Sequence, residues 1–127
     1  VNYTAAGVLA ECTPFIDDTA SAFAEADLIL CRAGASTVTE IAAVGAAAAY
    51  VPFPHAVDDH QTTNAKFVVD AGGGWLLPQA GLTAEAIARL LQSVTREELV
   101  KRAEAAKTLQ KTRATGDIVA ACEELAA

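Results

Sequence analysis

Short apolar runs alternate along this chain with longer stretches in which apolar residues recur every three or four positions. The runs at residues 28–31, 47–51 and 75–77 are continuous, as in strands that are buried on both faces of a sheet. The segment 8–13, which follows Gly7, is also predicted to be an extended strand. The pattern therefore predicts four short strands separated by helices.

The stretches with helical spacing have recognisable ends. Acidic and hydroxyl side chains stand where helices should begin, and Gly45 stands where one should end. Residues 1–7 are typical of the end of a helix that began upstream. The remaining helices are predicted at residues 17–26 (opened by Asp17 and Asp18), 36–45 (capped by Ser36 or Thr37, with Glu40 completing a capping box), 61–71, 84–92 (capped by Thr83), 96–111 (capped by Thr95) and 115–127.

Strands that alternate with helices of about ten residues indicate right-handed βαβ units and a parallel sheet. The predicted fold class is therefore α/β, a Rossmann-like parallel sheet flanked by helices. Residues 1–127 are read as a single domain, with no internal repeat or linker. Since a doubly wound sheet usually has five or six strands, we expect the chain to begin in mid-domain.

Composition sharpens the picture of the core. The chain has 127 residues, of which 30 are alanine, so we expect helices and strands to pack closely on small side chains. The longest apolar run, residues 46–54, is far shorter than the roughly 20 residues that span a bilayer. No basic region precedes an apolar run at the start, so no signal peptide is predicted.

Charge and cysteine exclude some function classes. The net charge of −7 disfavours non-specific nucleic-acid binding, which depends on neutralising phosphates. Residues 89–113 are basic, but they also carry glutamates, and we interpret them as a solvated helix face rather than a patch for anions or membranes. Cys12, Cys31 and Cys122 lack the spacing of a zinc site and are predicted to be buried free thiols of a cytosolic protein.

The candidate chemistry lies where the predicted strands end, because ligands of open α/β sheets bind beyond the carboxyl ends of the strands. After residues 28–31 the chain makes a turn of small residues and enters a helix, whose free N–H groups attract phosphate. Glu40 lies about one helical turn beyond Ser36 and could bind ribose hydroxyls. A simple capping box with a tight turn explains the same spacing, so both interpretations stay open.

A second polar cluster follows the next strand. His55 and His60 flank Asp58 and Asp59, which is compatible with a metal site or an acid–base pair, and equally with a solvated loop. Gln61 and Asn64, at the start of the next helix, could bind a sugar or could serve as caps. The signatures of esterases, P-loop NTPases and dinucleotide-binding enzymes are absent.

Taken together, these segments resemble the C-terminal domain of the MurG family of glycosyltransferases over nearly the whole chain. The family has the two-domain GT-B architecture and transfers N-acetylglucosamine (GlcNAc) from UDP-GlcNAc to lipid I, which makes lipid II for peptidoglycan. The residues that carry the resemblance are Phe15-Ile16-Asp17-Asp18, the run from Ala26 to Ile41 with its Cys31-Arg32-Ala33-Gly34-Ala35 turn, Val51-Pro52-Phe53-Pro54-His55 and Gln61-Thr62-Thr63-Asn64-Ala65.

The resemblance implies a donor-binding domain for UDP-GlcNAc. Phe15 and Ile16 would line the uracil pocket, and Glu40 would accept hydrogen bonds from the ribose. His60 and Gln61 would contact the GlcNAc hydroxyls, although His60 replaces a glutamine that is common in the family. The diphosphate and the nearby sugar would meet the start of the helix, at Ala35, Ser36, Thr37, Val38 and Thr39, where Ser36 replaces the usual Leu or Met.

The resemblance further implies an inverting transferase that needs neither a metal nor a cofactor. The lipid I acceptor site and the membrane contact would belong to an N-terminal domain that this chain lacks. The family's glycine-rich diphosphate loop is also absent from this chain, and no residue of it is assigned as the general base. The parent enzyme would be peripheral on the cytoplasmic face of the bacterial inner membrane, and the 127-residue chain would be inactive alone. The alternatives are another GT-B enzyme or a UDP-sugar epimerase, and a non-catalytic subunit of a split glycosyltransferase.

Overall fold

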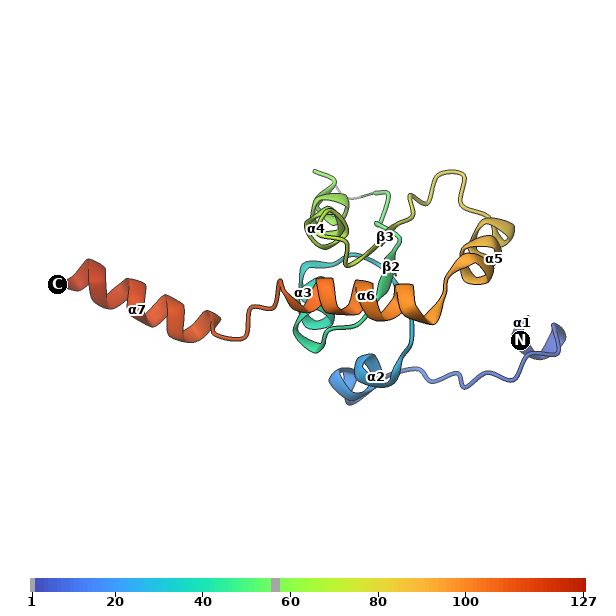
Figure 1. Cartoon of the computed structure of the whole chain (residues 1–127), viewed down its shortest axis with the longest axis horizontal. Helices are drawn as coiled ribbons and strands as arrows, with labels where there is room; N and C mark the ends of the chain where they lie inside the picture. The colour runs from blue at the N-terminus through green and yellow to red at the C-terminus, as the bar shows by residue number, and fades with distance from the viewer. Residues whose placement is uncertain (1, 56–57) are drawn as a thin grey trace.

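The computed structural model describes residues 2–55 and 58–127 and shows an α/β body with two projecting ends (Figure 1). The predicted fold class is confirmed, because the sheet is parallel and helices flank it. In chain order the elements are α1 (Asn2–Ala5), α2 (Thr19–Glu25), β1 (Ile29–Cys31), α3 (Ala35–Val44), β2 (Ala48–Tyr50), α4 (His60–Val69), β3 (Gly74–Leu76), α5 (Ala84–Ser93), α6 (Arg96–Lys107) and α7 (Ala114–Ala126).

Within the described residues the sheet has three strands in the order β1-β2-β3. Leu30 of β1 pairs with Ala49 of β2, which pairs with Trp75 of β3. Each crossover contains one helix, α3 or α4, as parallel pairing requires. This arrangement brings the carboxyl ends of all three strands to one edge, where the three following loops begin.

The fourth predicted strand, at residues 8–13, is wrong. This segment is extended, all of its residues are exposed, and it pairs with no strand of the described chain. Leu9 is completely exposed, and Leu30 on the outermost strand β1 is 52% exposed. An apolar, extended sequence becomes a strand only when a neighbour completes its hydrogen bonds, and the described residues supply none.

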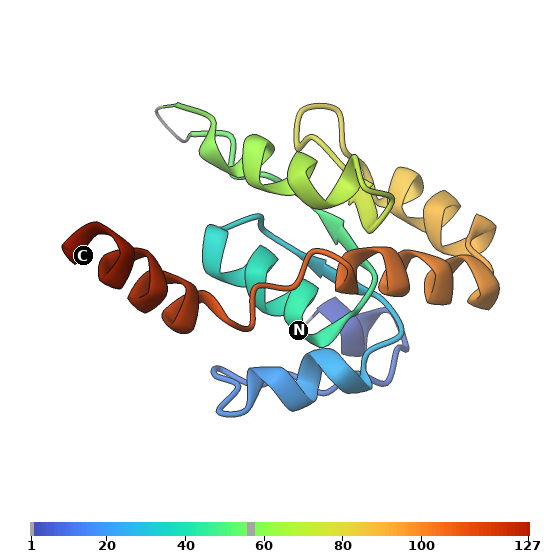
Figure 2. The same cartoon turned by 60° about the vertical axis from the view of Figure 1, so that its left-hand side comes forward.

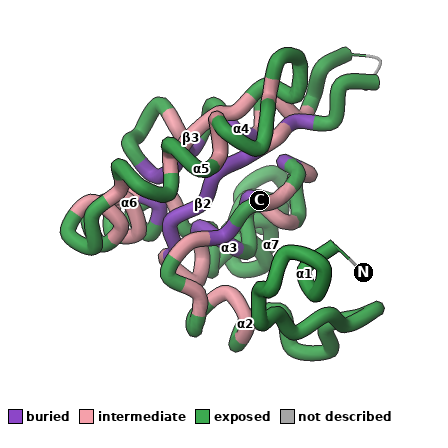
Figure 3. Tube along the Cα trace, turned by 90° about the vertical axis from the view of Figure 1, so that its right-hand side faces the viewer, coloured by how far each residue is buried: buried purple, intermediate pink, exposed green. Residues whose placement is uncertain are grey.

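The core is built on small side chains, as the composition indicates. β2 is buried along its whole length and lies at the centre of the buried part of the trace (Figure 3). α3 packs against α2, α4 and α6, and the glycines before β3 allow a close approach of α6. The buried apolar residues are Ile29, Ala33, Val38, Ile41, Ala42, Ala46, Ala47, Ala48, Ala49, Tyr50, Ala65, Val68 and Ala106.

The helix ends follow local chemistry in most places. Asp18 accepts from the Ser21 N–H at 3.0 Å, and Thr83 and Thr95 accept from N–H groups of α5 and α6. Gly45 ends α3 with a left-handed φ of 78° and donates to the Ile41 carbonyl. These predicted caps are confirmed.

The predicted capping box of α3 is wrong. The helix begins at Ala35, its N-cap is Gly34, and no side chain caps it. Ser36 and Thr37 thus lie inside the first turn, where their own N–H groups are among those without an intrahelical acceptor. The long basic helix is also shorter than predicted, since α6 ends at Lys107.

The two ends of the chain stand apart from the body. α7 projects away from the other helices in two views (Figures 1 and 2), and all of its residues are exposed. Cys122 on α7 and Cys12 near the N-terminus are exposed, so their predicted burial is wrong. Cys31 is partly buried, and burial raises the pKa of its thiol to about 11. No helix among the described residues is both long and apolar enough to cross a membrane.

Candidate functional site

The candidate site begins at the turn between β1 and α3. Val38 donates its N–H to the Gly34 carbonyl at 3.0 Å, so the amides of Ala35, Ser36 and Thr37 are the ones that precede the helical ladder. These three N–H groups and the helix dipole form the positive end of α3. An anion placed beyond the carboxyl end of β1 would meet that end.

Side chains on the first turns of α3 divide into packing and exposed groups. Val38 is buried and anchors the helix to the core. Thr39 donates its hydroxyl to the Ala35 carbonyl at 2.8 Å, which occupies the hydroxyl proton within the helix. Glu40 is exposed and lies four positions after Ser36, so the two side chains share one face of α3. A ligand at the helix start can therefore meet a carboxylate as well as amide donors.

Side chains on the first turn of α4 are hydrogen-bonded to the loop between β1 and α3. The Gln61 side-chain oxygen accepts from the N–H of Ala33 at 3.2 Å and from the N–H of Phe53 at 2.9 Å. The Asn64 amide donates to the Ala33 carbonyl at 3.1 Å. Both main-chain groups of Ala33 are thus held by α4, and Gln61 joins the loops that follow β1 and β2. Because the oxygen of Gln61 is occupied, its NH₂ group is what remains for a ligand.

His60 begins α4 and is exposed. Its Nε2 lies 3.5 Å from a carboxylate oxygen of Asp58, which is an ion pair only when the imidazole is protonated. Asp59 occupies the N-cap position with a φ of 50°, and its carboxylate accepts from the Thr62 hydroxyl at 2.7 Å. The predicted loop over residues 53–60 includes positions 56 and 57, which lie outside the described residues.

Metal-binding geometry is not found here. In residues 2–55 and 58–127, no cluster of three or more His, Cys, Asp or Glu is arranged to hold an ion. His55 instead packs edge-on against the ring of Phe53, with 5.5 Å between ring centroids.

Phe15 and Ile16 lie on the extended segment before α2 and are 76% and 50% exposed. The structure therefore brings together the predicted residues of α3 and α4, while this pair lies on a segment whose residues are all exposed. Asp18, two residues further on, has its pKa lowered by the hydrogen bonds from Ser21.

Sequence reasoning missed the side chain of Arg32. Its Nη1 donates to Gln79 Oε1 at 2.6 Å, to the Pro52 carbonyl at 3.3 Å and to the Val51 carbonyl at 3.4 Å. One guanidinium thus contacts the loops after β2 and β3 from the turn after β1. An arginine directly after a buried strand was the available signal, but its partners could not be read from spacing.

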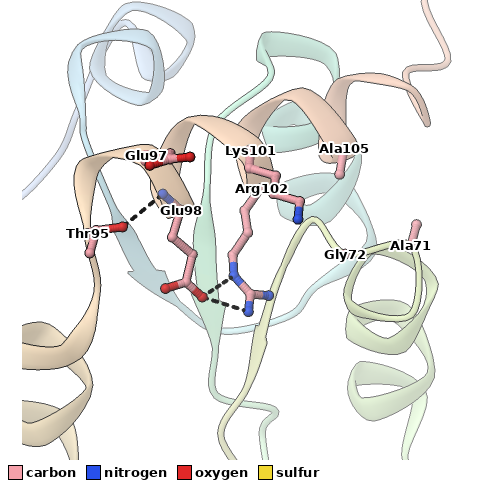
Figure 4. Close-up of a pocket in the computed structure, with 8 residues that line it drawn as sticks. All are labelled: Ala71, Gly72, Thr95, Glu97, Glu98, Lys101, Arg102 and Ala105. Carbon is pink, nitrogen blue, oxygen red and sulfur yellow. Dashed lines mark hydrogen bonds and ion pairs between the residues drawn. The ribbon is translucent and has the colours of Figure 1, made fainter.

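A hollow of about 490 Å³ lies elsewhere, between α6 and the turn before β3 (Figure 4). Part of its polar lining is paired: Arg102 binds Glu98, donates to the Gly74 carbonyl at 2.8 Å and stacks 4.0 Å from the ring centre of Trp75. The predicted solvated basic face is therefore wrong at Arg102, which braces α6 against β3. None of the candidate residues lines this hollow.

Comparison with known proteins places these observations in a family. Residues 3–118 match the glycosyltransferase family 28 C-terminal domain. The chain is 71% identical over 126 residues to the UDP-N-acetylglucosamine--N-acetylmuramyl-(pentapeptide) pyrophosphoryl-undecaprenol N-acetylglucosamine transferase of Paracidovorax citrulli (strain AAC00-1), covering 99% of this chain and 36% of that protein. It is 68% identical over 125 residues to the protein of the same name from Acidovorax sp. (strain JS42), covering 98% of this chain and 31% of that one.

The fold has a solved counterpart. The crystal structure of Acinetobacter baumannii MurG aligns with 94% of this chain and 35% of that chain, with a TM-score of 0.86 and 43% sequence identity. The chain spans about a third of the length of the curated relatives named above.

Proposed function

The chain belongs to the C-terminal domain family of glycosyltransferase family 28, and we propose that it is the donor-binding part of an enzyme that transfers GlcNAc from UDP-GlcNAc. The relatives are named as transferases of this sugar to a pyrophosphoryl-undecaprenol acceptor. By this proposal residues 1–127 form one partial domain, and the acceptor site and the general base lie in the rest of the parent enzyme. The parent would be peripheral on the cytoplasmic face of the inner membrane.

The observation that carries the proposal is the convergence of α3 and α4 on the turn at Ala33. The amides of Ala35, Ser36 and Thr37 would face the diphosphate, where negative charge grows as the sugar bond breaks. Since helix dipole and N–H groups already lie there before the ligand binds, little reorganisation is needed. Glu40 would accept hydrogen bonds from the ribose, and Gln61 and His60 would contact the GlcNAc hydroxyls. Phe15 and Ile16 would line the uracil pocket.

In the inverting reaction that the family resemblance implies, an acceptor hydroxyl attacks the anomeric carbon of GlcNAc as UDP leaves. The acceptor proton passes to a base, and the electron pair of the broken bond goes to the β-phosphate oxygen. The N-terminal amides of α3 in this chain would stabilise the negative charge on the leaving UDP. The donor NH₂ of Gln61 would orient the sugar ring for the attack.

Calorimetry with UDP tests the donor site. We expect weak UDP binding by the 127-residue chain, and the substitution Glu40→Ala should weaken it by roughly tenfold to 150-fold, since a hydrogen bond to a charged group contributes about 1.5–3 kcal/mol. Glu123→Ala, on the projecting helix α7, is the matched control and should bind like the wild type. Equal affinities for wild type and Glu40→Ala would disprove the ribose role.

A second assay tests the partial-domain proposal. The isolated chain should not transfer GlcNAc to a lipid I analogue, because by this proposal the acceptor site and the base lie elsewhere in the parent enzyme. Measurable turnover by the isolated chain would overturn that proposal, whatever the outcome for Glu40.

A further inference from the structure

The contact between Arg32 and Gln79 joins loops that are far apart in sequence. Arg32 lies in the turn after β1, and Gln79 lies in the loop after β3, 47 positions later. Their separation of 2.6 Å is the shortest that Arg32 Nη1 makes, while the carbonyls of Pro52 and Val51 are 3.3 and 3.4 Å away. Gln79 therefore makes the closest contact with the guanidinium of Arg32. The position of the guanidinium in turn determines its two longer hydrogen bonds to the β2 loop.

The β2 loop carries this constraint onward to Gln61. The ring of Phe53 lies under the guanidinium, with 5.6 Å from Arg32 Cζ to the ring centroid. The N–H of Phe53 donates to Gln61 Oε1 at 2.9 Å, which turns the NH₂ of Gln61 away from the two loops that its oxygen binds. A continuous series of contacts thus runs from Gln79 through Arg32 and the β2 loop to Gln61.

This series is placed at the surface rather than in the core. Arg32, Phe53 and Gln79 are all exposed, and exposed polar contacts contribute little to the free energy of folding. The core already holds β1, β2 and β3 in register. Gln79 adds a fixed position for the β2 loop at Pro52. Phe53, the residue after Pro52, orients the side chain of Gln61 through its N–H.

We propose that Gln79 is a positioning residue for the sugar end of the donor: by accepting from Arg32 it fixes the β2 loop and, through Phe53, the orientation of Gln61. The proposal rests on the proposed function, since it assigns the NH₂ of Gln61 to the sugar. Gln79 itself touches neither sugar nor diphosphate. Its loss should therefore affect recognition of the sugar more than recognition of UDP.

The test measures the dissociation constants of UDP-GlcNAc and UDP by calorimetry in the complete enzyme that carries this chain. Gln79→Ala removes the acceptor and should reduce the preference for UDP-GlcNAc over UDP by about threefold to tenfold, the scale of one ordinary hydrogen bond. Gln79→Glu keeps an oxygen acceptor facing Arg32 and should restore the preference. Gln92→Ala, an exposed glutamine on α5, is the control and should leave both constants unchanged.

A double-substitution cycle guards against a folding effect. In an Arg32→Lys background, whose side chain lacks the planar guanidinium, Gln79→Ala should change the preference by less than it does in the wild-type background. An unchanged preference in Gln79→Ala, or equal weakening of UDP and UDP-GlcNAc, would overturn the positioning role. Failure of the unmodified enzyme to bind UDP would instead overturn the proposed function.

Discussion

Asn64 donates its side-chain amide to the main-chain carbonyl of Ala33 at 3.1 Å, although 31 positions separate the two residues. Ala33 is fully buried, so water cannot replace this bond. Together with the acceptor oxygen of Gln61, it keeps the turn before α3 in one conformation. The main chain is therefore fixed at Ala33, directly before the N-cap Gly34 of α3.

Substitution of Asn64 tests the support directly. Asn64→Ala leaves the Ala33 carbonyl without its donor, and the free energy of unfolding should fall by about 1–3 kcal/mol. Urea unfolding measures this loss, and UDP affinity should fall with it. Asn2→Ala, on the exposed helix α1, should change neither quantity. A wild-type unfolding midpoint for Asn64→Ala would show that the bond does not hold the turn.

The orientation of Gln61 makes a separate prediction. Gln61→Glu keeps an oxygen for the N–H groups of Ala33 and Phe53 but removes the NH₂ donor. The added negative charge should weaken UDP and UDP-GlcNAc alike, while the extra affinity for UDP-GlcNAc over UDP is lost with the NH₂ donor. Gln61→Ala should weaken both ligands, because the two loops lose their common partner. Unchanged affinity of Gln61→Glu for UDP-GlcNAc would mean that the NH₂ does not contact the sugar.

Tyr50 has a buried hydroxyl with no hydrogen-bond partner among residues 2–55 and 58–127. Tyr50→Phe removes an unsatisfied polar group and should raise the free energy of unfolding by about 1 kcal/mol. Urea unfolding at neutral pH measures whether the free energy of unfolding rises in Tyr50→Phe. A large destabilisation would indicate that the hydroxyl has a partner in solution.

The same residue predicts a pH dependence. Burial, with a contribution from Cys31, raises the pKa of Tyr50 well above its usual value. The folded state then keeps its phenolic proton while the unfolded state releases one near pH 10, so the contribution of Tyr50 to stability is full below about pH 10 and falls as the pH rises further. In Tyr50→Phe the fall should be shallower, as measured by unfolding between pH 9 and pH 11. What remains of it should reflect Cys31, whose pKa of about 11 acts in the same direction.

Gly73 tests the close approach of α6 to the sheet. An added Cβ would lie 2.6 Å from Val68 Cγ1 and 3.0 Å from the Cα of Ala106. Because one of these atoms is main chain, Gly73→Ala should lower the free energy of unfolding by about 1–3 kcal/mol. Gly116→Ala, on α7 with open space around it, should not destabilise the body. Equal stabilities of the two variants would contradict a close approach of α6 at Gly73.

The first turn of α3 shows where local sequence reasoning stops. A serine, a threonine and a glutamate at capping-box spacing predicted a side-chain cap, yet Gly34 takes the N-cap position. The helix starts at Ala35, before the predicted caps, and Asn64 and Gln61 hold the residue before Gly34 by its main chain. Such support comes from another helix, so no local pattern reports it.

Arg102 shows the same limit on a surface helix. Its sequence context, a basic stretch with glutamates, is that of a solvated face. In the folded chain it stacks on Trp75 and donates to the Gly74 carbonyl, because α6 crosses the start of β3. The pattern of charges could not indicate a partner 27 positions away.

The sequence by itself determined the elements whose causes are local. Continuous apolar runs produced β1, β2 and β3, hydroxyl and acidic caps began α2, α5 and α6, and Gly45 ended α3, since each depends on neighbours within a few residues. Only the tertiary structure decided that residues 8–13 pair with no strand of the described chain, that α4 fixes Ala33, and that Arg32 meets Gln79. Those outcomes depend on hydrogen-bond partners that are far apart in the chain and become neighbours only when the parallel sheet brings the carboxyl ends of its strands together.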